Sequence, residues 1–144
     1  MHKALGFWAI PVMALVFGMV FLGCKNSKSS IEGTWINADV GAEEKIVFAN
    51  GDMEQSYNNE LYAKATYSLS EGTLTYTVTH LYGSTLFPET YEARWYTTDE
   101  LITAVPEYYE LFNEVFKPQT ARYSIKDNEL TITIQEETFI YIRE

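Results

Sequence analysis

The feature that most constrains this chain is an alternation of apolar and polar residues with a period of two, from residue 31 to the end. Successive side chains of a β-strand point to opposite faces, so this period is typical of antiparallel strands with one buried face. Turn residues interrupt the pattern at short intervals, because glycine and asparagine accept positive φ angles. The expected turns are Asn50-Gly51, Glu71-Gly72, Tyr82-Gly83 and Asp127-Asn128. The predicted strands cover 31–38, 43–50, 53–58, 62–70, 73–81, 89–97, 100–105, 120–126, 129–135 and 137–143.

So many short strands exceed what one open sheet usually holds. A closed barrel or a sandwich removes or protects the exposed strand edges. Short connections between sequential strands favour the barrel with up-and-down topology. We therefore predict an all-β domain, a small antiparallel up-and-down barrel of about eight to ten strands.

One hairpin sequence occurs twice in the chain. Residues 67–78 match residues 123–134 at a constant offset of 56. In both copies a tight turn reverses the chain, and three apolar residues of the second strand share one face. These are Leu74, Tyr76 and Val78 in the first copy, and Leu130, Ile132 and Ile134 in the second. Two copies are too few for a solenoid or a propeller, so we expect two hairpins at different positions around one barrel.

One short helix is predicted near 106–117. Apolar residues recur there on one helical stripe between Pro106 and Pro118. Proline is favoured at the first helical position, and a proline also disfavours helix at the residue before it. The sequence leaves two arrangements open, since the helix could cap a mouth of the barrel or pack against its outside.

The N-terminal segment indicates the compartment. No charged residue occurs from Ala4 to Gly23, a length that could just span a bilayer. The segment ends at Cys24 and changes at once to a polar stretch, which resembles a bacterial lipobox followed by a tether. We therefore predict a lipoprotein signal peptide over 1–23, a polar tether over 24–30 that begins with lipidated Cys24, and a folded domain over 31–144.

Cys24 is the only cysteine, so no intramolecular disulfide can form. Two or more acyl chains on such a cysteine hold a protein firmly on a bilayer. We therefore expect a lipid-anchored protein of the bacterial cell envelope, either periplasmic or exposed at the cell surface, with the membrane as its first partner.

The charge of the mature chain limits its other partners. All 20 acidic residues and nine of the ten basic residues follow residue 23, so the formal net charge there is −11. Nucleic acids and anionic lipid surfaces repel such a protein. The acidic residues are scattered along the chain, which is typical of a solvated surface.

The predicted domain opens with Ile31-Glu32-Gly33-Thr34-Trp35, and Gly33-x-Trp35 on a first strand resembles the opening motif of lipocalins and lipocalin-like bacterial lipoproteins. Phe48-Ala49-Asn50-Gly51 and the paired Tyr-Ser hairpins extend the resemblance in outline over residues 31–144. It implies that Trp35 closes the barrel floor and that an arginine of the last strand stacks on it. Arg143 is the candidate for this structural cation–π contact.

Motifs for catalysis are absent from the sequence. The mature chain has one histidine, His80, and neither a zinc-binding pattern nor an EF-hand, a phosphate loop or a nucleophile elbow. The pairs Glu43-Glu44 and Glu136-Glu137 lie beside predicted turns, and we interpret them as solvated charge. We expect no catalytic residue, metal or cofactor, and no enzymatic activity.

Aromatic residues are the remaining functional signal, with 11 Tyr, 5 Phe and 2 Trp after residue 23. Tyrosines inside a barrel offer an apolar ring and a hydroxyl to an enclosed ligand, although a small barrel can also be filled by its own side chains. The candidate ligand-binding residues are Trp35, Tyr67, Tyr76, Trp95, Tyr123 and Tyr141. The leading hypothesis is a carrier or sensor of a small apolar or amphipathic ligand. The alternative is a non-catalytic structural or interaction lipoprotein, with a filled barrel and an envelope or host protein as partner.

Overall fold

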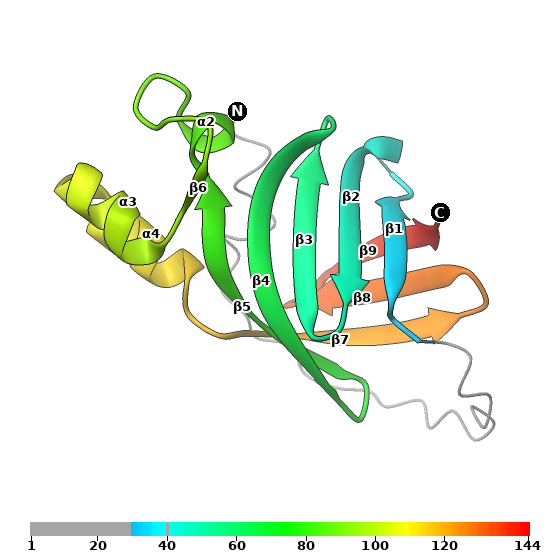
Figure 1. Cartoon of the computed structure of the whole chain (residues 1–144). Coiled ribbons are helices and arrows are strands. Elements are labelled where there is room, and N and C mark those ends of the chain that lie inside the picture. The colour runs from blue at the N-terminus through cyan, green and yellow to red at the C-terminus, as the bar shows by residue number, and fades with distance from the viewer. Residues whose placement is uncertain (1–29, 40) are drawn as a thin grey trace.

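Eight antiparallel strands form a closed barrel in the computed structural model, which describes residues 30–39 and 41–144. The strands are β1 (Gly33–Asn37), β2 (Gly41–Ala49), β3 (Asp52–Tyr57), β4 (Glu60–Ser70), β5 (Thr73–Tyr82), β7 (Gln119–Lys126), β8 (Glu129–Ile134) and β9 (Glu137–Arg143). Each strand pairs with the next of this series, and β1 pairs with β9 to close the ring (Figure 1). The predicted small up-and-down barrel is confirmed.

The floor of the barrel is the end that holds the turns 50–51, 71–72 and 127–128. Asn50 and Gly51 have φ angles of 53° and 83°, and Glu71 and Gly72 have 47° and 79°, as expected for these turns. The opposite end, here called the mouth, holds the β1–β2 connection and the turns at 58–59 and 135–136. The insertion that follows β5 also begins at the mouth.

The repeated hairpin occupies two positions around the floor, as the sequence predicted. Tyr67 and Tyr123 are equivalent residues of the two copies. The backbone N–H of Tyr67 donates to the carbonyl of Gly51 at 2.8 Å, and that of Tyr123 donates to the carbonyl of Gly72 at 2.9 Å. Each copy therefore ties its first strand to the turn before it.

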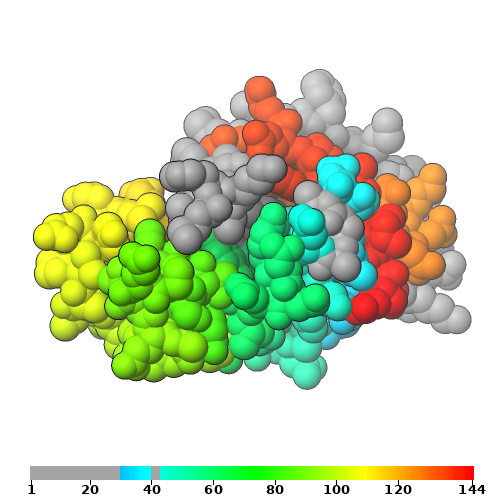
Figure 2. Space-filling view, turned by 90° about the horizontal axis from the view of Figure 1, so that it is seen from above, coloured from blue at the N-terminus to red at the C-terminus, as the bar shows by residue number. Residues whose placement is uncertain are grey.

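An insertion of short elements separates β5 from β7. It contains α2 (Gly83–Leu86), β6 (Trp95–Tyr96), α3 (Thr98–Ala104), the 3₁₀ helix η1 (Pro106–Tyr108) and α4 (Tyr109–Val115). β7 pairs with β5 only over Thr73–Tyr76, and β6 pairs with β5 near the mouth. Figures 1 and 2 show the insertion as a lobe at one side of the barrel.

Two strands predicted in this region are wrong. Residues 100–105 belong mostly to helix α3, and only Trp95–Tyr96 of the predicted strand 89–97 is a strand. A capping box starts α3: the N–H of Glu100 donates to the Thr97 hydroxyl, and the Glu100 carboxylate accepts from the N–H of Thr97. These reciprocal bonds satisfy helical N–H groups that lack an intrahelical partner, so the short apolar run becomes helix.

The helix predicted near 106–117 is shorter than expected. Its first turn is the 3₁₀ helix η1, and α4 ends at Val115. Phe112 and Val115 are buried in the same core cluster as the barrel side chains. The helix lies to one side of β5 and β6 (Figure 1), and its buried residues extend the core of the barrel into the insertion.

The expected turn at Tyr82-Gly83 is also wrong, because Gly83 begins α2 instead. Gly83 has no positive φ to explain the glycine. A Cβ atom there would lie 2.5 Å from the Tyr96 ring and 2.6 Å from both the Glu92 carbonyl and Cβ of Tyr91. Glycine is needed at this position for close packing of the insertion.

Candidate functional site

Trp35 and Arg143 close the floor of the barrel. The Trp35 side chain is fully buried, and its indole N–H donates to the Ile31 carbonyl at 2.7 Å. The Arg143 guanidinium lies 4.2 Å from the centroid of the Trp35 ring, which is the cation–π contact that the sequence suggested. Its two terminal nitrogens donate to the carbonyls of Glu32 at 2.7 Å and Ser30 at 2.8 Å. One side chain thus joins the last strand to the segment that leads into the first.

Gly33 makes room for this arrangement. It has a φ of 126°, and a Cβ atom there would lie 3.0 Å from a terminal nitrogen of Arg143. A larger residue would be strained in its backbone and would push the guanidinium away. Both residues of the Gly33-x-Trp35 motif therefore have a structural role at the floor.

The six aromatic candidates do not form one group. Tyr76 and Tyr141 are buried on the inner face of the barrel, close to the middle of their strands. Tyr67 and Tyr123 are partly buried and pack against the same core, and Tyr67 lies directly opposite Tyr76 on the neighbouring strand. The Tyr67 ring meets Phe48 edge to face, with centroids 5.1 Å apart.

Trp95 lies apart from the other candidates, on the outer face of the barrel. It pairs with Tyr82, whose ring it meets edge to face at 5.1 Å, and the ammonium of Lys64 lies 4.4 Å from its ring centroid. The period-two alternation predicted that Trp95 faces the interior of the barrel. This prediction is wrong, because only Trp95 and Tyr96 of the predicted strand 89–97 pair with a neighbouring strand.

Four polar side chains form a cluster inside the barrel, towards the mouth. The half-buried Glu44 carboxylate accepts hydrogen bonds from Tyr141 Oη at 2.8 Å and Gln55 Nε2 at 3.1 Å on one oxygen, and from Asn37 Nδ2 at 2.9 Å on the other. Asn37 and Gln55 are each 4 % exposed, and Tyr141 is 0 % exposed. We call these four residues the Glu44 cluster.

The Glu44 cluster corrects the interpretation of Glu43-Glu44 as solvated charge. Glu43 is exposed, whereas Glu44 shares the inner face with Ile46 and Phe48 two and four residues later. The signal was present in the same period-two pattern that predicted strand β2. The position of the pair beside a predicted turn favours solvated charge only for Glu43, which lies on the outer face.

Gln55 holds a buried acceptor without a partner. Its Nε2 faces the Glu44 carboxylate, which can only accept, so the amide orientation is fixed by that contact. The other end of the same amide, Oε1, is buried and has no hydrogen-bond partner among the described residues. Such an atom is unusual in a folded protein, because an unsatisfied buried acceptor costs about 1–3 kcal/mol.

The tyrosines of the inner face remain neutral hydrogen-bond donors at physiological pH. Burial raises the pKa of Tyr76 well above its ordinary value. Burial, with the nearby Glu44 charge second, does the same to the pKa of Tyr141. The cluster therefore presents a carboxylate supported by neutral groups.

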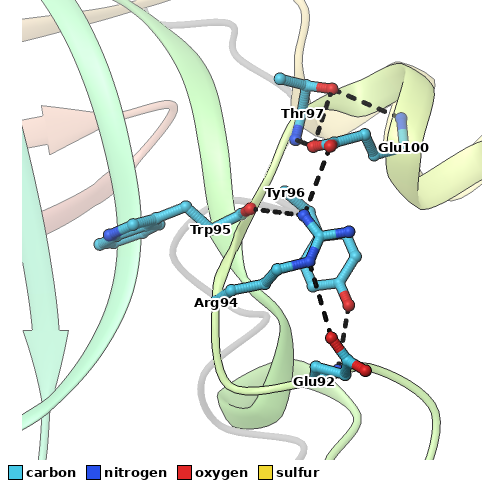
Figure 3. A network of polar contacts seen from close by, with 6 residues as sticks. All are labelled: Glu92, Arg94, Trp95, Tyr96, Thr97 and Glu100. Atoms are coloured by element: carbon cyan, nitrogen blue, oxygen red, sulfur yellow. Dashed lines mark hydrogen bonds and ion pairs between the residues drawn. The ribbon is translucent and has the colours of Figure 1, made fainter.

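A second group of polar contacts, outside the barrel, surrounds Arg94 (Figure 3). The Arg94 guanidinium lies 3.6 Å from the Tyr96 ring centroid and donates to the Trp95 carbonyl at 3.1 Å and to Glu100 at 3.3 Å. Glu92 donates its backbone N–H to the Tyr96 hydroxyl at 3.1 Å. These groups border a surface hollow of about 570 Å³. These groups pair with one another and anchor α3 to β6. A structural role therefore accounts for this group of residues.

His80 lies on the outer face of β5, where Nδ1 is 2.9 Å from the Thr79 hydroxyl oxygen. It lines a groove of about 460 Å³ over β2–β5, together with Val47, Glu54 and Lys64. Within the described part of the chain, no group of three His, Cys, Asp or Glu side chains is placed to hold a metal ion.

The predicted signal peptide 1–23 and Cys24 lie outside the described residues, as does most of the predicted tether. Among the residues that are described, no helix has the length and apolar character needed to cross a bilayer. Comparison of the chain with protein-family models, with curated proteins and with solved structures finds no match.

Proposed function

We propose that this protein is a non-catalytic, lipid-anchored lipoprotein of the bacterial envelope, whose lipocalin-like barrel holds a small apolar or amphipathic molecule. The anchor rests on the sequence around Cys24, where an uncharged run ends in a lipobox-like segment. The likeness to lipocalins rests on Gly33, Trp35 and Arg143, which close the floor together.

The observation that carries ligand binding is the Glu44 cluster in an otherwise apolar interior. Ligand sites are usually apolar and contain a few polar groups that fix orientation. Buried aromatic and aliphatic side chains form the rest of the interior, and Gln55 Oε1 is a buried acceptor to which no described residue donates. A bound molecule with a donor group and an apolar remainder satisfies both features.

Tryptophan fluorescence tests this proposal, because the mature chain has one tryptophan in the barrel and one outside it. Protein from cells that express the full chain is titrated with fatty acids, fatty alcohols, fatty amines and lysophospholipids. We expect a saturable change in tryptophan fluorescence. The change should persist in Trp95→Phe, which retains Trp35 as the reporter. A folded Trp95→Phe protein that responds to no member of the panel would remove the support for a carrier.

The anchor is tested separately by comparing the native chain with Cys24→Ala. The native protein should incorporate a palmitate analogue and sediment with membranes, whereas Cys24→Ala should do neither. Equal membrane recovery of both proteins would contradict lipidation at Cys24.

One observation favours the alternative, an interaction protein with a filled barrel. Many of the largest fully buried side chains lie on the inner face, including Trp35, Phe48 and Tyr141. The outer groove next to Lys64 and Trp95 then offers the binding surface for an envelope or host protein. Crosslinking in intact cells tests this function, and Lys64→Ala should reduce a specific adduct while ligand titrations stay flat.

A further inference from the structure

We propose that the Glu44 cluster binds the protonated amino group of a small amphipathic molecule. This inference rests on the proposed ligand-binding function and assigns the chemical class of the ligand. Three features of the cluster lead to it: its uncompensated charge, its free acceptor sites and its apolar surroundings.

The charge of Glu44 has no counter-charge among the described residues. The neighbouring Lys45 points to the outer face and pairs with Glu144 at 3.3 Å. Arg143 lies at the floor, over Trp35. No described lysine or arginine forms an ion pair with Glu44, and its hydrogen-bond donors are neutral. A carboxylate that is partly removed from water gains most from a cation, because electrostatic attraction is stronger where the dielectric is low.

The free positions of the cluster are all acceptors. One Glu44 oxygen already accepts two hydrogen bonds, and the other accepts one from Asn37, so one of about four lone-pair positions remains. Gln55 Oε1 adds a buried acceptor, which lies near the carboxylate because the same amide group donates to Glu44. An ammonium group has three donors and no acceptor, so it matches this set of free positions.

Other head groups match the cluster less well. A carboxylate or phosphate would meet the negative charge of Glu44 with no cation to offset the repulsion. A neutral hydroxyl has one donor, so it can satisfy Glu44 or Gln55 but leaves the charge uncompensated. A water molecule can donate to both residues, and it is the competitor that the experiment must exclude.

The test compares octylamine, 1-octanol and octanoate, which share an apolar chain and differ in head group. Each is titrated by calorimetry at pH 7 into the full-chain protein and into Glu44→Gln, which keeps the size of the side chain and removes its charge. Glu43→Gln is the matched control, because it removes the same charge from the outer face of the same strand. We expect octylamine to bind at least about tenfold more tightly than the other two, as a charge-assisted hydrogen bond provides.

The outcomes separate this inference from the proposed function. Loss of the amine preference in Glu44→Gln, with octanol binding kept and Glu43→Gln unchanged, supports the inference. Equal binding of all three probes leaves the carrier function standing and overturns the amine assignment. Binding of none of them counts against both the inference and the carrier function.

A second measurement keeps the inference testable if Glu44→Gln does not fold. The native protein is titrated with octyltrimethylammonium, which keeps the positive charge and the apolar chain but has no N–H donor for Glu44 or for Gln55 Oε1. It should bind at least about tenfold more weakly than octylamine. Equal affinities of the two cations would overturn the assignment of a hydrogen-bonded amino group.

Discussion

The floor and the mouth of this barrel are built in different ways. At the floor, turns of two residues join paired strands, and Arg143 fastens the last strand to the segment before the first through Trp35 and two carbonyls. At the mouth, β5 leaves β7, short helices fill the space, and a carboxylate faces inward. Among the described residues, the buried side-chain acceptor without a hydrogen-bond partner, Gln55 Oε1, lies towards the mouth. The floor therefore provides closure, and the mouth is where we propose that a ligand binds.

The largest effect should come from alkaline pH, which tests whether floor and mouth share one core. Burial raises the pKa of Tyr62, Tyr76 and Tyr141 above the unfolded value near 10. The folded state therefore holds these protons more tightly, and its stability is fully present below pH 10. Above that pH each tyrosine lowers the free energy of unfolding by up to about 1.4 kcal/mol per pH unit.

Ultraviolet absorbance should show the buried tyrosines ionising only as circular dichroism reports unfolding. Ionisation of all tyrosines near pH 10 in a folded protein would contradict a common sealed core.

The next largest effect should come from Trp35→Ala at the floor. The side chain is 0 % exposed, and its loss leaves a cavity under Arg143. We expect the free energy of unfolding to fall by about 3–5 kcal/mol. Trp95→Ala on the outer face is the matched control and should cost clearly less. Urea denaturation measures both, and equal losses would remove the distinction between these two tryptophans.

Gly83→Ala tests the packing of the insertion near the mouth. The added methyl group would overlap the Tyr96 ring, the Glu92 carbonyl oxygen and Cβ of Tyr91. We expect a loss of about 1–3 kcal/mol, which is typical of overpacking. Hydrogen exchange should become faster in the helices while the floor hairpins stay protected. Uniform loss of protection would show that the insertion and the barrel unfold as one unit.

The smallest effect should come from Thr97→Ala, which removes the hydroxyl of the α3 capping box. A lost cap costs about 1 kcal/mol. Thr97→Ser keeps the hydroxyl and should restore the native melting temperature. A Thr97→Ala protein that melts like the native one would mean that the Arg94 contacts alone hold α3 in place.

The floor was predicted well from the sequence, because the patterns that predict strands and tight turns are local. Alternation and the Gly and Asn turn residues depend on neighbours within a few positions, so the hairpins around Glu71-Gly72 and Asp127-Asn128 were placed correctly. The stacking of Arg143 on Trp35 could be suggested because the lipocalin resemblance supplies a pairing that no local pattern contains.

The mouth was predicted poorly for two physical reasons. The apolar run at 101–105 suits a strand or a helix, and the capping box of Thr97 and Glu100 decides between them. Glu44 has the spacing of an inward residue, but its donors Asn37, Gln55 and Tyr141 come from three other strands. Only the closed ring brings these residues together, so their cluster could not be derived from spacing along the chain.

The antiparallel pairing of β1 with β9 has a consequence for how the fold can be connected. The backbone N–H of Glu144 donates to the Thr34 carbonyl at 2.9 Å, so the last residue lies beside the first strand (Figure 1). During synthesis β1 leaves the ribosome first and β9 leaves after the other strands. The ring can therefore close only when β9 is available to pair with β1, which makes closure a late folding event. For the same reason the ring has no obligatory starting point. A circular permutant that joins residue 144 to residue 31 and opens at the Asn58-Asn59 turn would preserve every strand pair.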